Sequence, residues 1–330
     1  MKTRTFQAGL AALAMVALQA VQPATAAAPD PLPPLVWTTL GTAGGPVLQP
    51  DRFQPANLIT GGGRVWMVDC GDGAVQHLAA AGFQPPRVSA VFVSHLHQDH
   101  MGGLQALLGL RWMQAARTPI TVYGPPGIEE VVAGIVQALQ PSSRIGMSVR
   151  GARMGPSPAE SVKVVVMRDA TDLTVDGVRV RAARNSHFDE EPGHASDNGT
   201  ESLSYRFDVQ GYGVGYTGDS GPSDTLPAFF RGVDVLVSEV IDLPRIIDNI
   251  NGPDSPMPPQ VRPGLIAHLK AQHLTPQQAG AIAAAAGVKR LVFTHLAIVG
   301  PADKSAPGLI SGARETFRGE VSVAHDLEKF

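Results

Sequence analysis

Short apolar runs recur along the chain, separated by longer stretches of mixed polar and apolar residues. Runs of six to eight residues rich in β-branched side chains favour strands that are covered on both faces. The clearest of these runs are 64–69 (RVWMVD), 88–93 (VSAVFV), 233–240 (VDVLVSEV) and 289–294 (KRLVFT). Weaker patterns predict further strands around 58–59 and over 120–125, 162–167, 173–183, 203–209 and 213–216.

Helical patterns lie between these strands. They are predicted over 74–81, 103–116, 128–139 and 275–286. The last of them begins at Thr275-Pro276, a favourable cap and first-turn pair. Residues 252–263 (GPDSPMPPQVRP) are rich in proline and predict a loop, a candidate flap beside a site. Strands and helices alternate at both ends, which predicts a layered α/β fold with sheets inside and helices outside.

The first residues have the layout of a secretory signal. Lys2 and Arg4 precede an apolar run over 8–20, and a stretch of small residues follows. We expect cleavage between Ala26 and Ala28, so that 1–28 is the signal and 29–330 is one domain. The apolar run is shorter than the ~20 residues of a spanning helix, so no permanent membrane anchor is expected. These features predict a periplasmic or secreted protein.

Removal of the predicted signal, 1–28, changes the net charge of the chain. The chain has 330 residues, with 26 basic and 29 acidic side chains. Without Lys2 and Arg4, 24 basic residues remain against 29 acidic ones, a net charge of about −5. Nucleic-acid binders usually carry a basic patch, so nucleic acid is an unlikely partner on this ground. The single cysteine, Cys70, leaves core packing or bound metal to stabilise an exported chain.

The segment 94–103 (SHLHQDHMGG) concentrates the candidate chemistry. His95 and His97 are two residues apart, so in an extended chain their side chains point the same way. Asp99 and His100 follow after a turn that the two glycines permit. Imidazole nitrogen and carboxylate oxygen are ligands that zinc accepts. The spacing therefore predicts two metal half-sites on one short loop.

Each half-site is incomplete and needs ligands from elsewhere in the chain. His187, Asp219 and His295 each stand where a predicted strand becomes a loop. Sites in layered α/β proteins are built at such strand ends. A single histidine at a strand end is usually an ordinary polar residue, so these three are weaker candidates than the cluster.

Several motifs together resemble the metallo-β-lactamase fold superfamily. They are HLHQDH, DCG at 69–71, YGPPG at 123–127, TGDSGPSD and FTHL. The phrases VDCGDGAVQHL, GDSGPSDTLPAFFRGVDVLVSEV and QHLTPQQAG are most similar to its ribonuclease Z-like branch, which includes arylsulfatase-like and phosphodiesterase-like hydrolases. The resemblance covers about residues 36 to 300. It implies a four-layer αββα sandwich.

The resemblance also implies roles for individual residues. One zinc would be held by His95, His97 and His187, the other by Asp99, His100 and His295, with Asp219 bridging the two. Iron or manganese could replace one zinc. Asp99 would serve in catalysis as well as in metal binding. His273 would donate a proton near the leaving group, and Glu239 would orient it.

These roles predict metal-assisted hydrolysis. Two zinc ions would hold a bridging water and lower its pKa towards ~7, which makes hydroxide available at neutral pH. His273 would then protonate the departing alkoxide or phenoxide. A non-catalytic metal-binding module is the alternative from another class.

The substrate is less constrained. Ribonuclease Z enzymes that process transfer RNA carry a long protruding arm, and no such basic arm is visible in the segment between His187 and Asp219. With the leader and the acidic balance, this favours a small-molecule sulfate or phosphate ester, with an aryl sulfate preferred. The alternative is a β-lactam or a lactone. The resemblance also implies a possible homodimer, because members of the family often form dimers.

Overall fold

The computed structural model describes residues 34–145, 156–189 and 199–330. The predicted secretory signal, 1–28, lies outside these residues. Residues 190–198, in the segment between His187 and Asp219, lie outside them as well.

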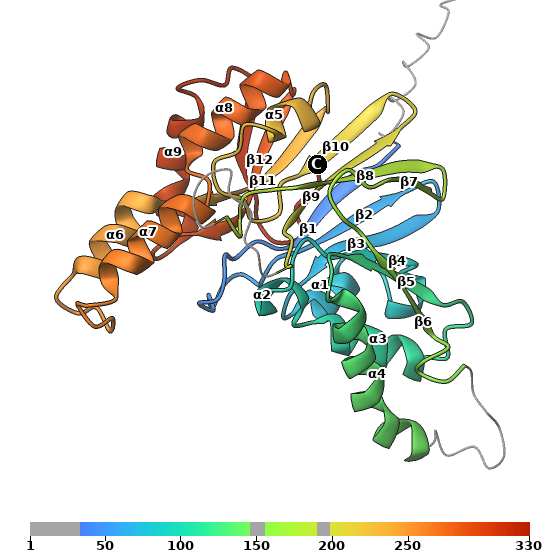
Figure 1. Cartoon of the computed structure of the whole chain (residues 1–330). Coiled ribbons are helices and arrows are strands. Elements are labelled where there is room, and N and C mark those ends of the chain that lie inside the picture. Colours follow the sequence, from blue (N-terminus) through green and yellow to red (C-terminus); the bar gives the residue numbers. More distant parts are fainter. Residues whose placement is uncertain (1–33, 146–155, 190–198) are drawn as a thin grey trace, which may run out of the picture. The chain divides into compact units, whose positions relative to one another are not determined.

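The first sheet has six strands in sequence order (Figure 1). β1, β2 and β3 pair antiparallel, and β3 to β6 pair parallel. The strands are β1 (Val36–Gly41), β2 (Ala56–Gly61), β3 (Arg64–Cys70), β4 (Ala90–Phe92), β5 (Ile120–Gly124) and β6 (Val162–Val166).

The second sheet has seven strands in the order β13-β12-β11-β10-β9-β8-β7. β7 to β10 pair antiparallel, and β10 to β13 pair parallel. The strands are β7 (Asp172–Val175), β8 (Val178–Arg184), β9 (Leu203–Val209), β10 (Tyr212–Tyr216), β11 (Val235–Ile241), β12 (Arg290–Ala297) and β13 (Glu320–Val323).

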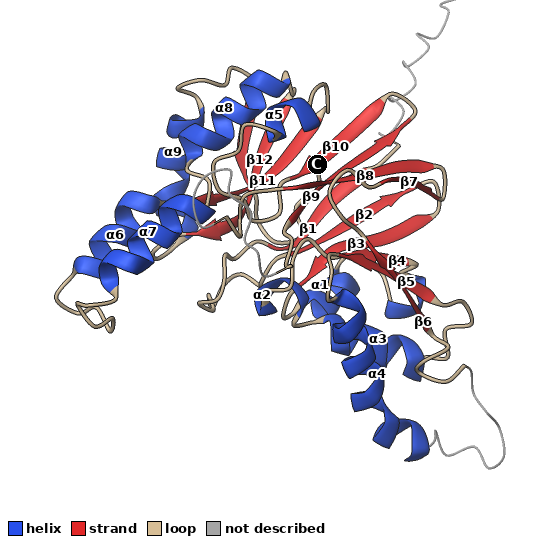
Figure 2. Ribbon diagram, viewed as in Figure 1, coloured by secondary structure: helices blue, strands red, loops and turns tan. Residues whose placement is uncertain are grey.

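Helices cover the outer face of each sheet (Figure 2). The first group is α1 (Ala74–Ala80), α2 (Gln98–Met101), α3 (Leu104–Met113) and α4 (Ile128–Ile145), with a 3₁₀ turn at Pro85–Arg87. The second group is α5 (Leu226–Phe229), α6 (Leu243–Asn251), α7 (Arg262–Gln272), α8 (Pro276–Ala286) and α9 (Ala302–Ala313). In the described part of the chain, no helix is long and apolar enough to cross a membrane.

The strands are apolar on both faces because each sheet is covered on both sides. Along β3, Trp66 and Val68 pack between the two sheets, whereas Val65 and Met67 pack against the helices of the first group. Leu236 of β11 likewise packs against α5, α8 and α9. Three core clusters thus separate four layers, which confirms the predicted αββα sandwich. The largest aromatic side chains between the sheets are Trp37, Trp66, Phe92, Tyr205, Phe207 and Tyr216.

Two of the predicted elements differ in the structure, and β1, β13, α5, α6, α7 and α9 were not predicted. The strand expected over 173–183 is a hairpin, because Asp176 and Gly177 both have positive φ, of 43° and 80°, as a two-residue hairpin turn requires. The helix expected to end near residue 139 continues through Pro141 to Ile145. The helix at 275–286 is as predicted, and Thr275 forms a capping box with Gln278.

The parallel strands determine where the site lies. The carboxyl ends of parallel strands meet at the same edge of a sheet, and ligands bind beyond them. β4 of the first sheet and β10, β11 and β12 of the second sheet end beside the candidate ligands.

Candidate metal centre

The histidine cluster begins directly after β4. The chain stays extended as far as His97, which caps the short helix α2. Asp99 and His100 lie inside this helix, whereas the sequence had predicted a loop. The helical turn presents both side chains to the same side of the chain, and both are buried. The expected division of the cluster into two half-sites is thus produced by a strand end followed by one helical turn.

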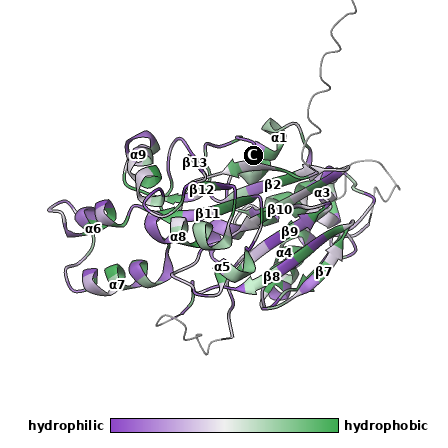
Figure 3. Ribbon diagram, turned by 90° about the horizontal axis from the view of Figure 1, so that it is seen from above, coloured by the Kyte–Doolittle hydropathy of each residue, from purple (hydrophilic) through white to green (hydrophobic). Residues whose placement is uncertain are grey.

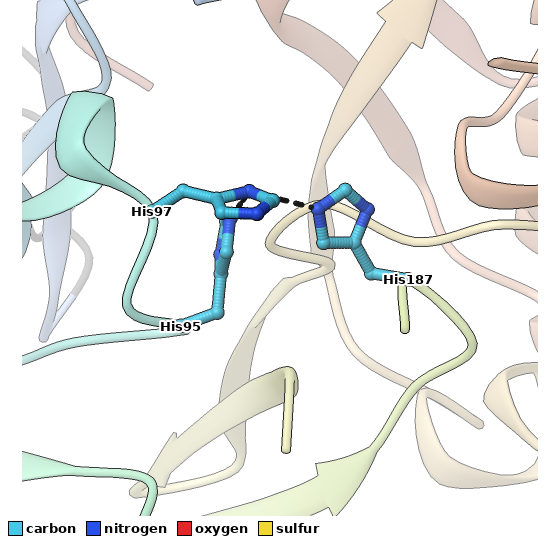
Figure 4. A group of neighbouring side chains, drawn as sticks. All are labelled: His95, His97 and His187. Atoms are coloured by element: carbon cyan, nitrogen blue, oxygen red, sulfur yellow. Dashed lines mark hydrogen bonds between the residues drawn. The ribbon is translucent and has the colours of Figure 1, made fainter. Parts of the chain in front are cut away.

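The first group of ligands is His95, His97 and His187, whose rings point toward one another in Figure 4. Nε2 of His95 and Nε2 of His187 lie 3.0 Å and 3.2 Å from Nδ1 of His97. One ring nitrogen carries either a hydrogen or a lone pair, so it cannot satisfy both neighbours. A cation between the three nitrogens would satisfy all of them.

The second group is Asp99, His100 and His295. Oδ2 of Asp99 lies 3.6 Å from Nε2 of each histidine. The two imidazole rings stack with their centroids 5.1 Å apart. His295 lies within β12 at a position where the pairing with β11 shifts, and its φ is +42°. This irregular backbone turns the His295 side chain toward the cluster.

Asp219 lies between the two groups. Its Oδ1 is 3.3 Å from Nε2 of His100, and its Oδ2 is 3.1 Å from Nε2 of His295. The same Oδ2 is 4.0 Å from Nε2 of His95 and of His187. The structure therefore brings all seven predicted ligands together, with one carboxylate shared by both groups.

The first group favours neutral imidazole. Burial lowers the pKa of His95 well below its ordinary value. Burial likewise lowers the pKa of His187 to about 3. His187 Nδ1 lies 2.9 Å from the carbonyl oxygen of Gln272, which accepts its hydrogen and leaves Nε2 with a lone pair. Neutral imidazole is the form that binds metal ions.

The second group attracts positive charge. Burial lowers the pKa of His295, but the carboxylate of Asp219 more than offsets this and raises it to about 10. Burial raises the pKa of Asp99, but the nearby imidazole of His295 and the charge of His100 lower it to about 2. Two carboxylates therefore remain charged in a buried site, where a cation would compensate them.

Unsatisfied buried atoms support the same conclusion. Nε2 of His100, Oδ1 of Asp219 and Nε2 of His295 have no hydrogen-bond partner among the described residues. Buried polar atoms nearly always have a partner, so atoms without one point to a missing ligand. These nitrogen and oxygen donors fit a divalent metal ion such as zinc.

Asp69 is a residue whose role the sequence did not reveal. Its buried carboxylate accepts hydrogen bonds from the backbone nitrogen of Ser94 at 2.7 Å, from Nδ1 of His100 at 2.8 Å and from the hydroxyl of Tyr216 at 2.7 Å. A carboxylate on the far nitrogen of a ligating histidine fixes its tautomer and orientation. The DCG motif at a strand end was the available signal, and the φ of Asp69 is +56°.

His273 and Glu239 form a pair beside the centre, as predicted. Nδ1 of His273 lies 2.7 Å from Oε2 of Glu239, and Oε1 of Glu239 accepts a hydrogen bond from the backbone nitrogen of Ser220. Burial lowers the pKa of His273, but the charge of Glu239 outweighs it, and the pKa is raised. Burial raises the pKa of Glu239, and the charge of His273 opposes this shift. The pair holds a proton on His273 and leaves its Nε2 free.

Phe188 is a second residue that the sequence analysis did not single out. Its half-buried ring lies with its centroid 5.7 Å, 5.2 Å and 4.9 Å from those of His95, His97 and His187. The ring thus walls one side of the first ligand group. Cys70 is fully buried, and burial raises the pKa of its thiol.

The sequence matches a family model and named relatives. Residues 64–296 match a model described as a β-lactamase superfamily domain. Ribonuclease Z of Mycobacterium avium (strain 104) is 34% identical over an alignment of 307 positions, which covers 88% of this chain and 96% of that protein. Ribonuclease Z of Mycobacterium tuberculosis (strain H37Rv) is 31% identical, with the same two coverages.

Solved structures share the fold. The metallo-β-lactamase fold protein YhfI from Bacillus subtilis has a TM-score of 0.64 and 20% identity, covering 90% of this chain and 100% of that one. The short form of human tRNase Z has a TM-score of 0.59 and 20% identity, covering 89% and 98%.

These relatives overturn two expectations. The expected arylsulfatase-like activity, with a β-lactamase or lactonase as alternative, is wrong, because relatives that match over nearly their whole length are named ribonuclease Z. The exclusion of nucleic acid in favour of a small-molecule ester is wrong for the same reason. Net charge is a sum over the whole chain. It therefore does not show whether a few basic side chains form a local surface that could bind a polyanion.

The fold, the ligand cluster of this chain and the coverage of the relatives agree. Their combination also settles the general chemistry, which is metal-dependent hydrolysis of ester bonds. The chain belongs to the metallo-β-lactamase superfamily, in its ribonuclease Z-like branch.

Proposed function

We propose that the protein is a dinuclear metal-dependent phosphodiesterase that cleaves RNA. The observation that carries the proposal is the convergence of two three-residue ligand groups on the carboxylate of Asp219. It occurs in a chain that is 34% identical to a ribonuclease Z over 96% of that protein. Two cations at one carboxylate suit the in-line displacement at a phosphodiester.

The ligand assignment proposed here follows the geometry. His95, His97 and His187 hold one ion, and Asp99, His100 and His295 hold the other, with Asp219 shared. Zinc fits a donor set rich in imidazole, and iron or manganese in one position is compatible with the same donors. Bound divalent ions supply Lewis acidity that polarises a phosphoryl oxygen and lowers the pKa of water.

The protein's own residues complete the reaction. Glu239 holds Nδ1 of His273, so that Nε2 can give its proton to the departing ribose oxygen. The charge of Glu239 raises the pKa of His273 and so favours the protonated imidazole. Phe188 excludes water from one side of the histidine ligands.

His273 could instead serve as a metal ligand. One of its ring nitrogens lies within 4.8 Å of donor atoms of His187 and Asp219. The bond to Glu239 leaves Nε2 available for either role. Metal analysis separates them, because a ligand's removal lowers the metal content and a proton donor's removal does not.

RNA cleavage tests the function. A labelled precursor of transfer RNA and an unstructured RNA are incubated with zinc-loaded protein, and the products are separated on a gel. We expect cleavage that is lost in the Asp219→Asn variant. Protein that binds two metal ions per chain and cleaves neither RNA would refute the proposal.

We also propose that residues 1–28 direct export, on the basis of the basic, apolar and small-residue layout. The RNA substrate would then be met outside the cytoplasm. N-terminal sequencing of protein from the periplasmic and culture fractions tests this. A chain that keeps Met1 and stays in the cytoplasm would contradict it.

A further inference from the structure

The helices α6 and α7 form a hairpin joined by the proline-rich residues 252–261. In Figures 1 and 3 the two helices run side by side, apart from α8 and α9. Ile250 is the only buried side chain of α6, and α7 has none. The hairpin therefore exposes most of its surface. The predicted flap, 252–263, corresponds to its tip and to the first turn of α7.

A groove of about 570 Å³ runs along α7, and Asn251 of α6 and Pro259 of the connecting residues complete its wall. Arg262, Ile266 and Lys270 line it at intervals of four residues, which places them on one face of the helix. Pro263 and Ala267 form the adjacent row. The groove thus has an apolar floor with a cation at each end, separated by roughly 12 Å along the helix axis.

The two cations are not compensated within the described residues. Nε of Arg262 donates a hydrogen bond to the carbonyl oxygen of Met257 at 2.9 Å, which holds the side chain at the groove. Neither Arg262 nor Lys270 forms an ion pair with a described residue, and α7 contains no acidic residue. Arg179 and Arg181 of β8, by contrast, pair with Asp172 and Asp208. The groove is a positive surface on an acidic protein.

The end of α7 is attached to the metal centre. Its last residue, Gln272, accepts the hydrogen bond from His187 through its carbonyl oxygen, and His273 follows directly. The carbonyl of Ala271 packs so closely on Gly221 that a Cβ there would overlap it. Lys270 therefore lies three residues from the proposed proton donor, and the groove leads away from the centre along the same helix.

We propose that this groove binds the backbone of the RNA substrate and leads it to the metal centre. Arg262 and Lys270 contact successive parts of the phosphate chain, and Pro263 and Ile266 contact a base between them. RNA is favoured over other partners because its charge and its apolar bases complement a surface with cations around an apolar floor. The inference rests on the proposed function and names the surface that recognises the substrate.

Binding and cleavage of RNA by an Arg262→Gln/Lys270→Gln double variant test the inference. The wild-type and variant proteins, loaded with zinc, are titrated against a fluorescent, nuclease-resistant phosphorothioate RNA of twenty nucleotides at several salt concentrations. Losing two phosphate contacts lowers the slope of log affinity against log salt by about 1.4 and raises Kd roughly 10- to 30-fold at 0.1 M salt. Lys163→Gln, which removes an exposed cation from β6, is the matched control.

Turnover supplies the second measurement. The ratio of kcat/KM for RNA to kcat/KM for bis(4-nitrophenyl) phosphate should fall by a similar factor in the double variant, because the small diester is too short to reach the groove. Unchanged salt slope and ratio would overturn the inference, as would failure of the wild-type protein to bind the RNA. A change in molar mass in solution without a change in RNA affinity would assign the groove to a second copy of the chain, and overturn it too. Wild-type protein that binds RNA with the expected slope but cleaves none would refute the proposed function alone.

Discussion

The carboxylate of Asp69 lies 2.8 Å from Nδ1 of His100, on the side of the ring that faces away from Asp219. The hydrogen on His100 is thereby placed on Nδ1, and Nε2 is left to face the metal centre. Asp69 itself is held by Ser94 and Tyr216, so the ring has one orientation. This contact makes Asp69 a positioning residue for a proposed ligand.

An Asp69→Asn variant should bind the metal of the second group more weakly. The amide keeps the size of the side chain but loses the charge that orients His100, so metal affinity should fall about 10- to 100-fold. Competition with a zinc chelator measures the affinity. Asp208→Asn, at the surface of the second sheet, is the control. Equal affinities in Asp69→Asn and wild type would show that the hydrogen bond has no role in binding.

An Asp219→Asn variant should be impaired more severely. Asp219 contacts both ligand groups, so both ions should bind more weakly, and phosphodiester turnover should fall by more than about 100-fold. Elemental analysis after gel filtration gives the metal content. Retention of two ions together with normal turnover would exclude the shared-ligand role.

A His273→Ala variant should keep its metal and lose rate. Removing a general acid typically costs about 10²- to 10⁴-fold. A substrate with a good leaving group, such as a nitrophenyl ester, should be affected less than RNA because it needs no proton. Loss of metal from this variant would instead identify His273 as a ligand.

The alkaline limb of the pH profile should depend on Glu239. The Glu239 carboxylate raises the pKa of His273, and a general acid is active only while protonated, so activity is lost as the pH rises through that pKa. A Glu239→Gln variant removes the charge and lowers the pKa, so its alkaline limb should move to lower pH. An alkaline limb at the same pH in the variant and the wild type would show that Glu239 does not set the pKa of the proton donor.

A Gly45→Ala variant should disturb the second ligand group. A Cβ at Gly45 would overlap the carboxylate of Asp99, which must then move away from His100 and His295. A displacement of about 1 Å at a catalytic group can cost 10²-fold in rate. Metal content should fall from two ions toward one. Gly134→Ala, whose Cβ would meet no atom within 4 Å, is the control and should match wild type.

Removal of the metal ions should lower the melting temperature. Without them, Asp99 and Asp219 stay charged in a buried site whose histidines have unsatisfied nitrogens. An ion present at ~1,000 times its Kd stabilises the folded state by about 4 kcal/mol. Calorimetry with and without a chelator measures the difference, and re-addition of zinc should restore it.

Much of the fold could be predicted because its strands are apolar on both faces. Segments such as 64–69 and 233–240 are short, β-branched and bounded by polar residues, which leaves little choice of structure. The hairpin at Asp176-Gly177 was missed because both of its strands share one alternating pattern. α7 was missed because none of its side chains is buried, so its apolar residues give a weak pattern.

The seven proposed ligands could be listed from motifs, but their arrangement could not. Local spacing predicts that His95 and His97 act together, whereas the distance from His100 to Asp219 depends on how two sheets pack. The DCG motif marks Asp69 but does not give the distant residues that it contacts, and no motif encodes the ring contacts of Phe188. The substrate was predicted wrongly because overall charge and a missing arm said nothing about a local surface such as that of α7.

The ligands come from both halves of the sandwich: His95 to His100 follow a strand of the first sheet, whereas His187 and Asp219 follow strands of the second and His295 lies within one. The thickness of the aromatic layer between the sheets, built by residues such as Trp37 and Phe92, therefore sets the distance between the two halves of the centre. A substitution that thins this layer far from any ligand changes coordination before it unfolds the chain. The catalytic rate then depends on how the interior packs. The effect of a core substitution should therefore be measured as a change in catalytic rate as well as a change in melting temperature.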